Sequence, residues 1–244
     1  MNLKICWMYH DLMDLYGDKG NVQVLKIRAQ KRHIECIVDT CSLKEEKDLS
    51  NYDLLFIGGG ADKEQSLLVE DLLSRKENIQ KAMDEGSFVL LICGGYQLFG
   101  KYYLDGDGNK IEGLGFFDYY TESASRDVRC IGNIAIEADV EGEKFKAVGF
   151  ENHGGQTKNV STPFGRVLSG QGNSFGCGFE GFYNGSVLGT YMHGPLLPKN
   201  PQIADLILRK ALKKRYGDVK LEQLDDTLEN KAREVMLTRI LKAQ

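Results

Sequence analysis

The sequence FVLLICGGYQLFG, residues 88–100, decides the fold. Its first five residues are all apolar, which predicts a central strand covered on both faces, as in parallel sheets. Cys93 and two glycines follow directly, and the pattern after them favours a helix. A strand that turns sharply into a helix at a cysteine is typical of a nucleophile elbow, where small neighbours let a substrate approach. This stretch therefore predicts an α/β protein with a reactive thiol at Cys93.

The segments before residue 88 repeat the same alternation of strand and helix. Short apolar runs alternate with amphipathic patterns of helical period, which is typical of parallel βαβ units. The apolar run that ends at Ile57 leads into Gly58–Gly60, much as the later run leads into Cys93. The predicted strands are Leu3–Tyr9, His33–Val38 and Asp53–Ile57, and the predicted helices are Asn21–Lys31 and Gln65–Glu85.

The pattern changes after about residue 105, where DGDGN predicts a turn over residues 105–109. Asn200 and Pro201 predict a helix start, with Asn as the cap and Pro in the first position. Because no repeat or low-complexity linker divides the chain, we predict a single α/β domain over residues 1–244. Its central sheet is mostly parallel and flanked by helices, and C-terminal helices occupy about residues 200–242. The later predicted strands are Gly115–Tyr120, Ile131–Ala138, Ala147–Glu151, Gly165–Leu168 and Ser186–Met192, and Thr227–Leu241 is the last helix.

The composition is that of a soluble globular protein. The chain is 42% hydrophobic and 27% charged, with a formal net charge of -4. This charge argues against a nucleic-acid partner. No apolar stretch approaches the roughly 20 residues of a membrane span, and the N-terminus lacks a signal-peptide pattern, so we expect a cytoplasmic protein. The six cysteines form no CxxC pair and have no histidine at ligand spacing, so no metal site is expected.

A second segment is expected to bring a reactive side chain close to Cys93. LGTYMHGP, residues 188–195, is a second apolar run that ends in a reactive residue, His193. Parallel sheets gather such strand ends at one edge, so Cys93 and His193 are expected to meet there. A helix N-terminus and a histidine both favour the thiolate that a cysteine nucleophile needs. His10, His33 and His153 compete with His193 for this role.

The glycine loop after Ile57 predicts an oxyanion hole. Glycines at a strand end let backbone N–H groups point at one spot, as acyl transfer requires. We expect Gly59 and Gly60 to act together with the N–H of Gly94. Neither this loop nor the YGDKGN segment, residues 16–21, is followed by the Gly-Lys-Ser/Thr of a phosphate loop. The sequence thus predicts no nucleotide or other cofactor in this chain.

These motifs together resemble the cobyric acid synthase-type branch of the class I glutamine amidotransferases. More narrowly, they resemble the glutaminase subunits of lipid II isoglutaminyl synthases. The resemblance implies that Cys93 forms a glutamyl thioester and that His193 is first base and then acid. It also implies that Gln97 and Arg129 hold L-glutamine, with Arg126 as the alternative to Arg129. The motifs that carry it are CGGYQ (93–97), GGG (58–60), YGD (16–18), YTES (120–123), GFENHGG (149–155) and HGPLLPKN (193–200).

The resemblance also implies a partner. The expected partner is the Mur ligase-like subunit MurT, which would carry ATP and metal and form a heterodimer with this chain. Ammonia made here would then amidate D-glutamate in the lipid II stem peptide to D-isoglutamine. Two alternatives stay open: a glutaminase for another acceptor, such as a cobyrinate-type substrate, and a non-catalytic thiol-sensing relative on the same fold.

The chain departs from the wider class at one position. Class I enzymes usually carry a glutamate two residues after the catalytic histidine, and Pro195 stands there in this chain. A carboxylate on the second ring nitrogen would fix the tautomer and stabilise the imidazolium. Our hypothesis is that a partner subunit supplies this acid. Glu151 and Asp18 are the alternatives within the chain.

Overall fold

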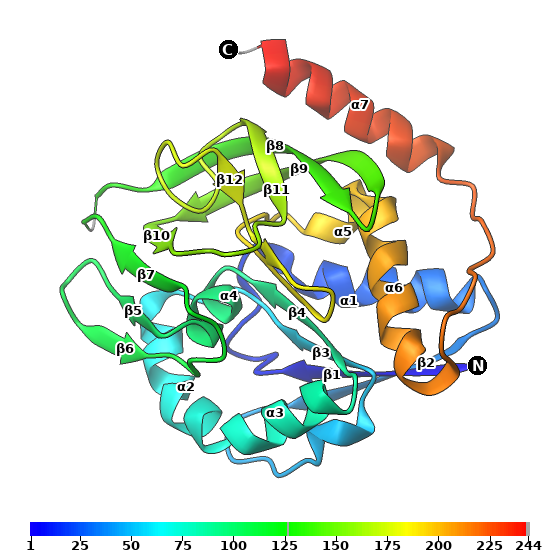
Figure 1. The fold of residues 1–244 in the computed structure, drawn as a ribbon, viewed down its shortest axis with the longest axis horizontal. Coiled ribbons are helices and arrows are strands. Elements are labelled where there is room, and N and C mark those ends of the chain that lie inside the picture. The colour runs from blue at the N-terminus through cyan, green and yellow to red at the C-terminus, as the bar shows by residue number, and fades with distance from the viewer. Residues whose placement is uncertain (126, 243–244) are drawn as a thin grey trace.

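A six-stranded sheet forms the centre of the molecule (Figure 1). A computed structural model describes residues 1–125 and 127–242. Five strands of the sheet run parallel and one edge strand, β13, is antiparallel, so the predicted mostly parallel sheet is confirmed. In spatial order the strands are β13 (Phe182–Tyr183), β14 (Val187–Thr190), β4 (Phe88–Ile92), β3 (Leu54–Ile57), β1 (Asn2–Met8) and β2 (Glu35–Cys41).

Helices cover both faces of this sheet, as right-handed βαβ crossovers require (Figure 1). One face carries α1 (Lys19–Gln30), α5 (Leu196–Lys199) and α6 (Pro201–Tyr216). The other carries α2 (Asp62–Ser74) and α3 (Lys76–Asp84), and α4 (Gly94–Phe99) starts where β4 ends. Two short 3-10 helices, η1 (Leu15–Gly17) and η2 (Leu49–Asn51), lie in the loops.

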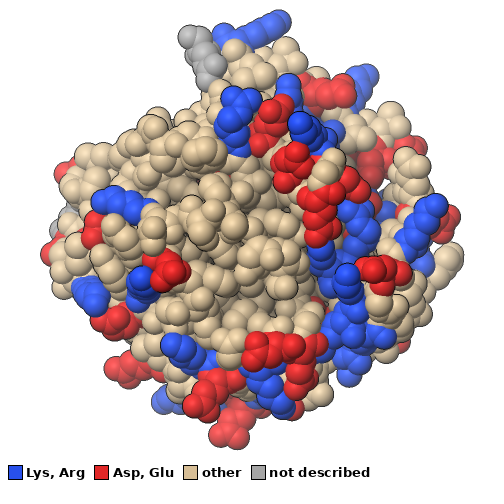
Figure 2. All heavy atoms as spheres, in the orientation of Figure 1, with Lys and Arg blue, Asp and Glu red and all other residues tan. Residues whose placement is uncertain are grey.

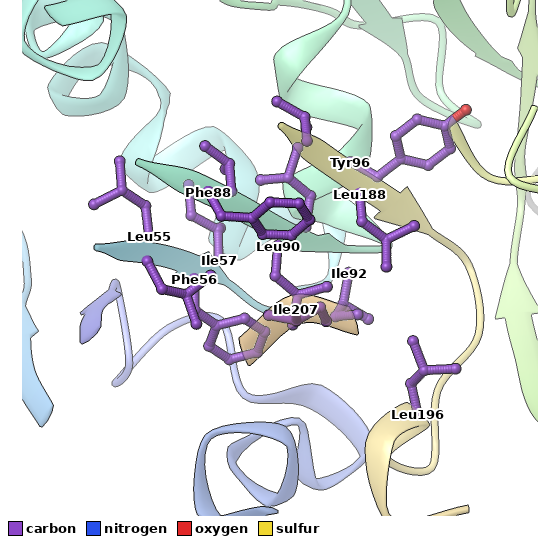
Figure 3. Close-up of a cluster of buried hydrophobic side chains, with 14 of the residues drawn as sticks. Leu55, Phe56, Ile57, Phe88, Leu90, Ile92, Tyr96, Leu188, Leu196 and Ile207 are labelled. Atoms are coloured by element: carbon purple, nitrogen blue, oxygen red, sulfur yellow. The ribbon is translucent and has the colours of Figure 1, made fainter. Parts of the chain in front are cut away.

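The hydrophobic core lies against the middle strands (Figure 3). All five residues of β4 are buried, as expected for a strand with helices on both faces. Ile207 of α6 and Leu196 of α5 pack below the strands, next to side chains of β3 and β4. Each fully buried aliphatic side chain stabilises the fold by roughly 1.5–3 kcal/mol. This packing makes β4 a rigid base for the residue that follows it, Cys93.

The predicted single helix Gln65–Glu85 is wrong, because the chain breaks at Arg75 into α2 and α3. The backbone of Arg75 has φ -89° and ψ 0°, which lies outside the helical region. Its buried guanidinium donates to Asp71 and to the carbonyl oxygens of Ser42 and Glu45 beyond β2. These long-range contacts override a local pattern that favours one continuous helix.

Two small four-stranded sheets, in the orders β10-β7-β5-β6 and β12-β11-β8-β9, occupy the middle of the chain. The predicted turn 105–109 is confirmed, since it joins β5 to β6. The predicted strand Gly115–Tyr120 is wrong: Leu114 and Gly115 instead donate to the carbonyl oxygens of Leu98 and Gly100 at the end of α4. The strands are β5 (Tyr102–Leu104), β6 (Lys110–Glu112), β7 (Tyr120–Ser123), β8 (Cys130–Val140), β9 (Glu143–His153), β10 (Gly155–Lys158), β11 (Gly165–Ser169) and β12 (Phe179–Glu180).

Asn200 precedes α6 as predicted, but it does not cap the helix with its side chain. Its carboxamide instead accepts from the N–H of Val148 at 3.0 Å and donates to the carbonyl oxygens of Val148 and Leu196 at 2.8 Å. Asn200 therefore ties β9 to the segment between β14 and α6. That segment contains His193.

The C-terminal helix α7 (Thr227–Lys242) follows an extended segment and packs on β8, β9 and β11 (Figure 1). A partly buried ion cluster stabilises the segment, in which Arg28 of α1 bonds Asp205 and Asp226 at 2.6–2.9 Å. None of the helices in the described part of the chain combines the length and the apolar character needed to cross a bilayer. Figure 2 shows basic and acidic side chains interspersed around a broad uncharged centre on this face.

Candidate active site

Cys93 lies at a sharp turn between β4 and α4. Its backbone has φ 50° and ψ -102°, which is strained for a residue with a side chain. Its N–H donates to the carbonyl oxygen of Thr190 at 2.8 Å, so the turn is fixed to the neighbouring strand β14. Gly95 permits this geometry, because a Cβ there would lie 2.7 Å from the carbonyl oxygen of Ile57. The local geometry is that of the predicted elbow, and Cys93 is 6% exposed.

His193 is held beyond the end of β14 by β9. Its backbone forms an isolated antiparallel bridge with Phe150, with N–H to O distances of 2.7 and 3.2 Å. The imidazole is fully buried. A Cβ built on Gly59 would lie 2.7 Å from Cε1 of His193 and 3.4 Å from Cβ of Cys93. The structure thus brings Cys93 and His193 together at the carboxyl edge of the sheet, next to the glycine loop.

Asp18 completes this group. Its Oδ1 lies 3.5 Å from Nδ1 of His193, and both side chains are fully buried. Its Oδ2 accepts from the N–H of Gly59 at 2.7 Å, which fixes the carboxylate. Pro195 packs on Gly20 at the start of α1, only two residues beyond Asp18. The structure therefore favours an acid from this chain over our hypothesis of an acid from a partner subunit.

The charges around His193 favour its protonated form. Burial disfavours an imidazolium, but Cys93 and Asp18 outweigh that effect and raise the pKa of His193 to about 10. Neither ring nitrogen of His193 has a hydrogen-bond partner among the described residues, although Nδ1 lies 3.5 Å from Oδ1 of Asp18. The arrangement suits a thiolate–imidazolium pair, in which Nδ1 faces Asp18 and Nε2 is left for proton transfer.

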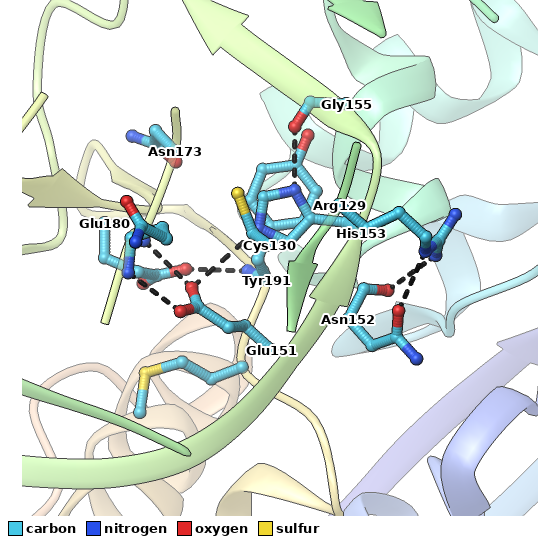
Figure 4. Close-up of polar contacts among 12 residues, drawn as sticks. Arg129, Cys130, Glu151, Asn152, His153, Gly155, Asn173, Glu180 and Tyr191 are labelled. Carbon is cyan, nitrogen blue, oxygen red and sulfur yellow. Dashed lines mark hydrogen bonds and ion pairs between the residues drawn. The ribbon is translucent and has the colours of Figure 1, made fainter. Parts of the chain in front are cut away.

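The competing residues Glu151 and His153 have other contacts (Figure 4). Glu151 follows Phe150 on β9, the residue that pairs with His193. Its carboxylate accepts from the N–H groups of Gln171 and Gly172 at 2.8 and 2.9 Å. His153 bonds the carbonyl oxygen of Gly155 at 2.7 Å and stacks on Tyr191 with ring centroids 3.7 Å apart. Glu151 therefore holds the loop at Gln171 and Gly172, and His153 holds the start of β10.

The three predicted oxyanion glycines differ in what their N–H groups do. The N–H of Gly59 donates to Asp18, so this structure does not support Gly59 as an oxyanion donor. No hydrogen bond from the N–H of Gly60 or Gly94 to another described residue is found. Gly60 and Gly94 therefore remain the candidate donors, and Gly59 instead positions the acid.

Gln97 is buried one turn beyond Cys93 and belongs to an internal network. Its Nε2 donates to the hydroxyl of Tyr191 at 3.3 Å, and its Oε1 accepts from Gln65 at 3.0 Å. A Cβ on Gly155 would lie 2.4 Å from Nε2 of Gln97. These contacts indicate that Gln97 supports the wall of the site. Its predicted contact with substrate stays a prediction.

Arg129 is exposed and contacts Asn152 of β9. Its guanidinium donates to the side chain and the backbone of Asn152 at 2.9 and 3.1 Å (Figure 4). Asn152 donates to the hydroxyl of Tyr16 at 2.5 Å, and the Tyr16 ring contacts that of His193 at 5.1 Å between centroids. Two hydrogen bonds and one ring contact thus connect Arg129 to His193. Arg126, the alternative, lies outside the described residues.

If Arg129 binds the substrate carboxylate as predicted, replacing it by alanine is expected to raise KM for glutamine by about 10- to 100-fold, because that charge-assisted contact is lost. The rate at which a small alkylator modifies Cys93 should not change, since the thiol keeps its neighbours. Arg166→Ala is the matched control, because Arg166 pairs with Glu137 on the exposed sheet. Loss of thiol reactivity together with turnover would instead indicate a structural role.

Several site residues were not predicted from the sequence, among them Tyr16, Asn152 and Gln65. Tyr16 and Asn152 lie in the YGD and GFENHGG segments, whose motif character was the available signal. Gln65 shows no sequence signal beyond its place shortly after the glycine loop. Among residues 1–125 and 127–242 no group of three His, Cys, Asp or Glu side chains is arranged to hold a metal ion.

Comparison with known proteins agrees with this geometry. Residues 4–201 match the CobB/CobQ-like glutamine amidotransferase domain. The GatD subunit of a glutamine-hydrolysing lipid II isoglutaminyl synthase from Staphylococcus aureus is 40% identical over 235 residues, 95% of either chain. The corresponding subunit from Streptococcus pneumoniae is 41% identical over 93% of this chain and 87% of that one.

A solved glutamine amidotransferase structure is similar in fold, with a TM-score of 0.53 and 17% identity over 84% of this chain and 98% of that one. The predicted α/β fold is thus confirmed by its structural neighbour as well as by its own sheet. The chain belongs to the CobB/CobQ-like glutamine amidotransferase family.

Proposed function

We propose that this chain is the glutamine-hydrolysing subunit of a lipid II isoglutaminyl synthase. The observation that carries the proposal is the similarity to a subunit of that name over 95% of both chains. The match of 235 residues is longer than the family domain at 4–201, so it includes most of the C-terminal helices. The grouping of Cys93, His193 and Asp18 supports the chemistry.

The first half of the reaction forms a thioester. The Cys93 thiolate attacks the side-chain carbonyl carbon of L-glutamine, and the carbonyl oxygen becomes an oxyanion bound by the N–H groups of Gly60 and Gly94. The C–N bond then breaks while the imidazolium of His193 donates its proton from Nε2 to the departing nitrogen. Ammonia leaves, and Cys93 carries the glutamyl group.

The second half of the reaction releases glutamate. His193, now neutral, accepts a proton from a water molecule that attacks the thioester. The C–S bond breaks and the thiolate returns, paired again with the imidazolium. Asp18 keeps Nδ1 of His193 protonated through both halves, which fixes the tautomer. Arg129 holds the α-carboxylate of the substrate.

The ammonia acceptor belongs to a partner subunit. We propose the Mur ligase-like subunit MurT, which would use ATP and metal to activate the α-carboxyl of D-glutamate in the lipid II stem peptide. Both subunits would act in the cytoplasm. A cobyrinate-type acceptor is less well supported, because the relatives named as lipid II isoglutaminyl synthase subunits match this chain nearly end to end.

The test follows the amide nitrogen. Glutamine labelled in its side-chain amide nitrogen is supplied to this chain, the partner subunit, ATP and lipid II, and the lipid product is examined by mass spectrometry. Label in the D-isoglutamine amide is the expected result. With Cys93→Ala the label should be absent, and free ammonium salt should restore amidation. Unlabelled product from the wild type, or no amidation of lipid II, would contradict the proposal.

A further inference from the structure

Gln65, in the first turn of α2, is a buried amide between the glycine loop and the elbow. It is 1% exposed. Its Nε2 donates to the carbonyl oxygen of Gly60 at 3.3 Å and to Oε1 of Gln97 at 3.0 Å. One side chain thus joins the loop after β3 to the helix that begins after Cys93.

Gln65 also packs against the second candidate donor, Gly94. A Cβ on Gly94 would lie 3.1 Å from both Cδ and Nε2 of Gln65, and 3.0 Å from Cε of Met13. A Cβ on Gly60 would lie 2.3 Å from Sδ of Met13. Gln65 and Met13 therefore fill the space along Gly60 and Gly94, so a side chain at either glycine would require them to shift.

The direction of the Gln65 amide follows from its partners. The carbonyl of Gly60 can only accept, so Nε2 of Gln65 must face it, and Gln97 must then present its Oε1. Nε2 of Gln97 in turn donates to the hydroxyl of Tyr191, which lies 2.6 Å from the hydroxyl of Thr157. Gln65 thus donates to Gln97, and Gln97 donates to Tyr191. Successive hydrogen bonds of this kind polarise and strengthen one another, so the network restrains the position of Gln65.

Oε1 of Gln65 is the second observation that points to function. It is buried and has no hydrogen-bond partner among the described residues. A buried unpaired carbonyl costs roughly 1–3 kcal/mol. An apolar side chain of similar shape would avoid that cost, but it would leave the carbonyl oxygen of Gly60 and Oε1 of Gln97 without the donor that Gln65 supplies, so the buried amide serves to hold these two groups.

We propose that Gln65 is a positioning residue that sets the distance between the N–H groups of Gly60 and Gly94, and thus the fit of the oxyanion hole. The proposal rests on the proposed glutaminase function. Gln65 acts through these two residues, because it bonds the carbonyl oxygen of Gly60 and packs against Gly94. Its loss should weaken binding of the transition state and leave ground-state binding of glutamine almost unchanged.

The test uses two variants of the full chain, under conditions in which the wild type hydrolyses glutamine. Gln65→Met removes both hydrogen bonds of the amide, and Gln65→Glu keeps the shape but loses the Nε2 donor. Both should lower kcat by about 10- to 100-fold with KM within about 3-fold, as expected when donors are displaced by a fraction of an ångström to 1 Å. The rate of Cys93 alkylation by a small electrophile should stay at the wild-type value.

A second measurement is the affinity for a ligand whose oxygen occupies the oxyanion hole. The aldehyde analogue of glutamine adds the Cys93 thiol to give a hemithioacetal, whose oxygen lies where the oxyanion forms. Its affinity should fall by the same factor as kcat, while that of the product glutamate should not change. Gln80→Met is the matched control, since Gln80 is a glutamine on α3 that bonds Asp84 on the exposed face. It should behave as the wild type.

Three outcomes would overturn the proposal: unchanged kcat in both variants, a rise in KM that accounts for the whole loss, or equal loss of affinity for the aldehyde and for glutamate. Thermal melts identify a variant that fails to fold, and the shape-matched Gln65→Glu variant then decides. Failure of the wild type to hydrolyse glutamine would contradict the proposed function instead. The two failures are therefore distinguishable.

Discussion

Replacing Cys93 by alanine is expected to lower the rate of glutamine hydrolysis by at least about four orders of magnitude, because the reaction loses its nucleophile. His193→Ala should cause a loss of similar size, since the thiolate then has no proton partner. The double variant should be no worse than either single one, because two residues that act as a unit do not contribute additively. Ammonia release, measured in steady state, gives all three values.

Two matched variants control for the loss of a thiol or an imidazole. Cys177 is the exposed cysteine of the six, and His33 lies on the loop before β2. Cys177→Ala and His33→Ala should keep wild-type turnover. A folded Cys93→Ala protein that still releases ammonia at the wild-type rate would refute the assignment of the nucleophile. A crippled His153→Ala with a mild His193→Ala would refute that of the base.

Asp18→Asn is expected to lower kcat/KM by about 100- to 10,000-fold. The asparagine keeps an oxygen for the N–H of Gly59, so the loop should hold, but His193 loses the charge that stabilises its imidazolium. Since Asp18 helps to raise the pKa of His193 to about 10, its neutral replacement should lower that pKa. The alkaline limb of the pH profile of kcat/KM should therefore move towards neutral pH.

The control for this substitution is Asp14→Asn. Asp14 lies four residues earlier in the same loop and accepts from the N–H of Lys19 on the exposed side. It should change neither the rate nor the pH profile. If Asp18→Asn were as active as the wild type once the partner subunit is bound, the acid would come from the partner, as our sequence hypothesis held.

Short sequence patterns were enough to predict the strands of the central sheet and the two candidate catalytic residues that follow β4 and β14, Cys93 and His193. The all-apolar β4, the cysteine with two glycines and the late histidine each carry their signal within a few residues. Because the carboxyl ends of parallel strands meet at one edge, the convergence of Cys93 and His193 followed from the fold class. The β-strands at Cys130–Val140 and Glu143–His153 were recognised but are longer than predicted, because their outer residues pair without an apolar pattern.

Contacts between distant segments explain what the sequence did not reveal. The sequence offered Asp18 and Glu151 as alternative acids without deciding between them, because Asp18 approaches His193 through the packing of α1 on the segment that contains Pro195. Gly59 was predicted to donate its N–H to the oxyanion, but in the structure this N–H donates to Asp18, which is distant in the sequence. The helix break at Arg75 likewise depends on carbonyl groups some 30 residues away. Each case is a tertiary contact that overrides a local pattern.

We propose that Cys93 alone among the six cysteines attacks glutamine. The most direct measurement treats the protein with an electrophilic diazoketone analogue of glutamine and maps the adduct by peptide mass spectrometry. We predict a single adduct on Cys93, prevented by excess glutamine and absent from His193→Ala on the same timescale, although Cys93 is only 6% exposed. An adduct on the exposed Cys177 in place of Cys93, or labelling that glutamine does not prevent, would contradict the account.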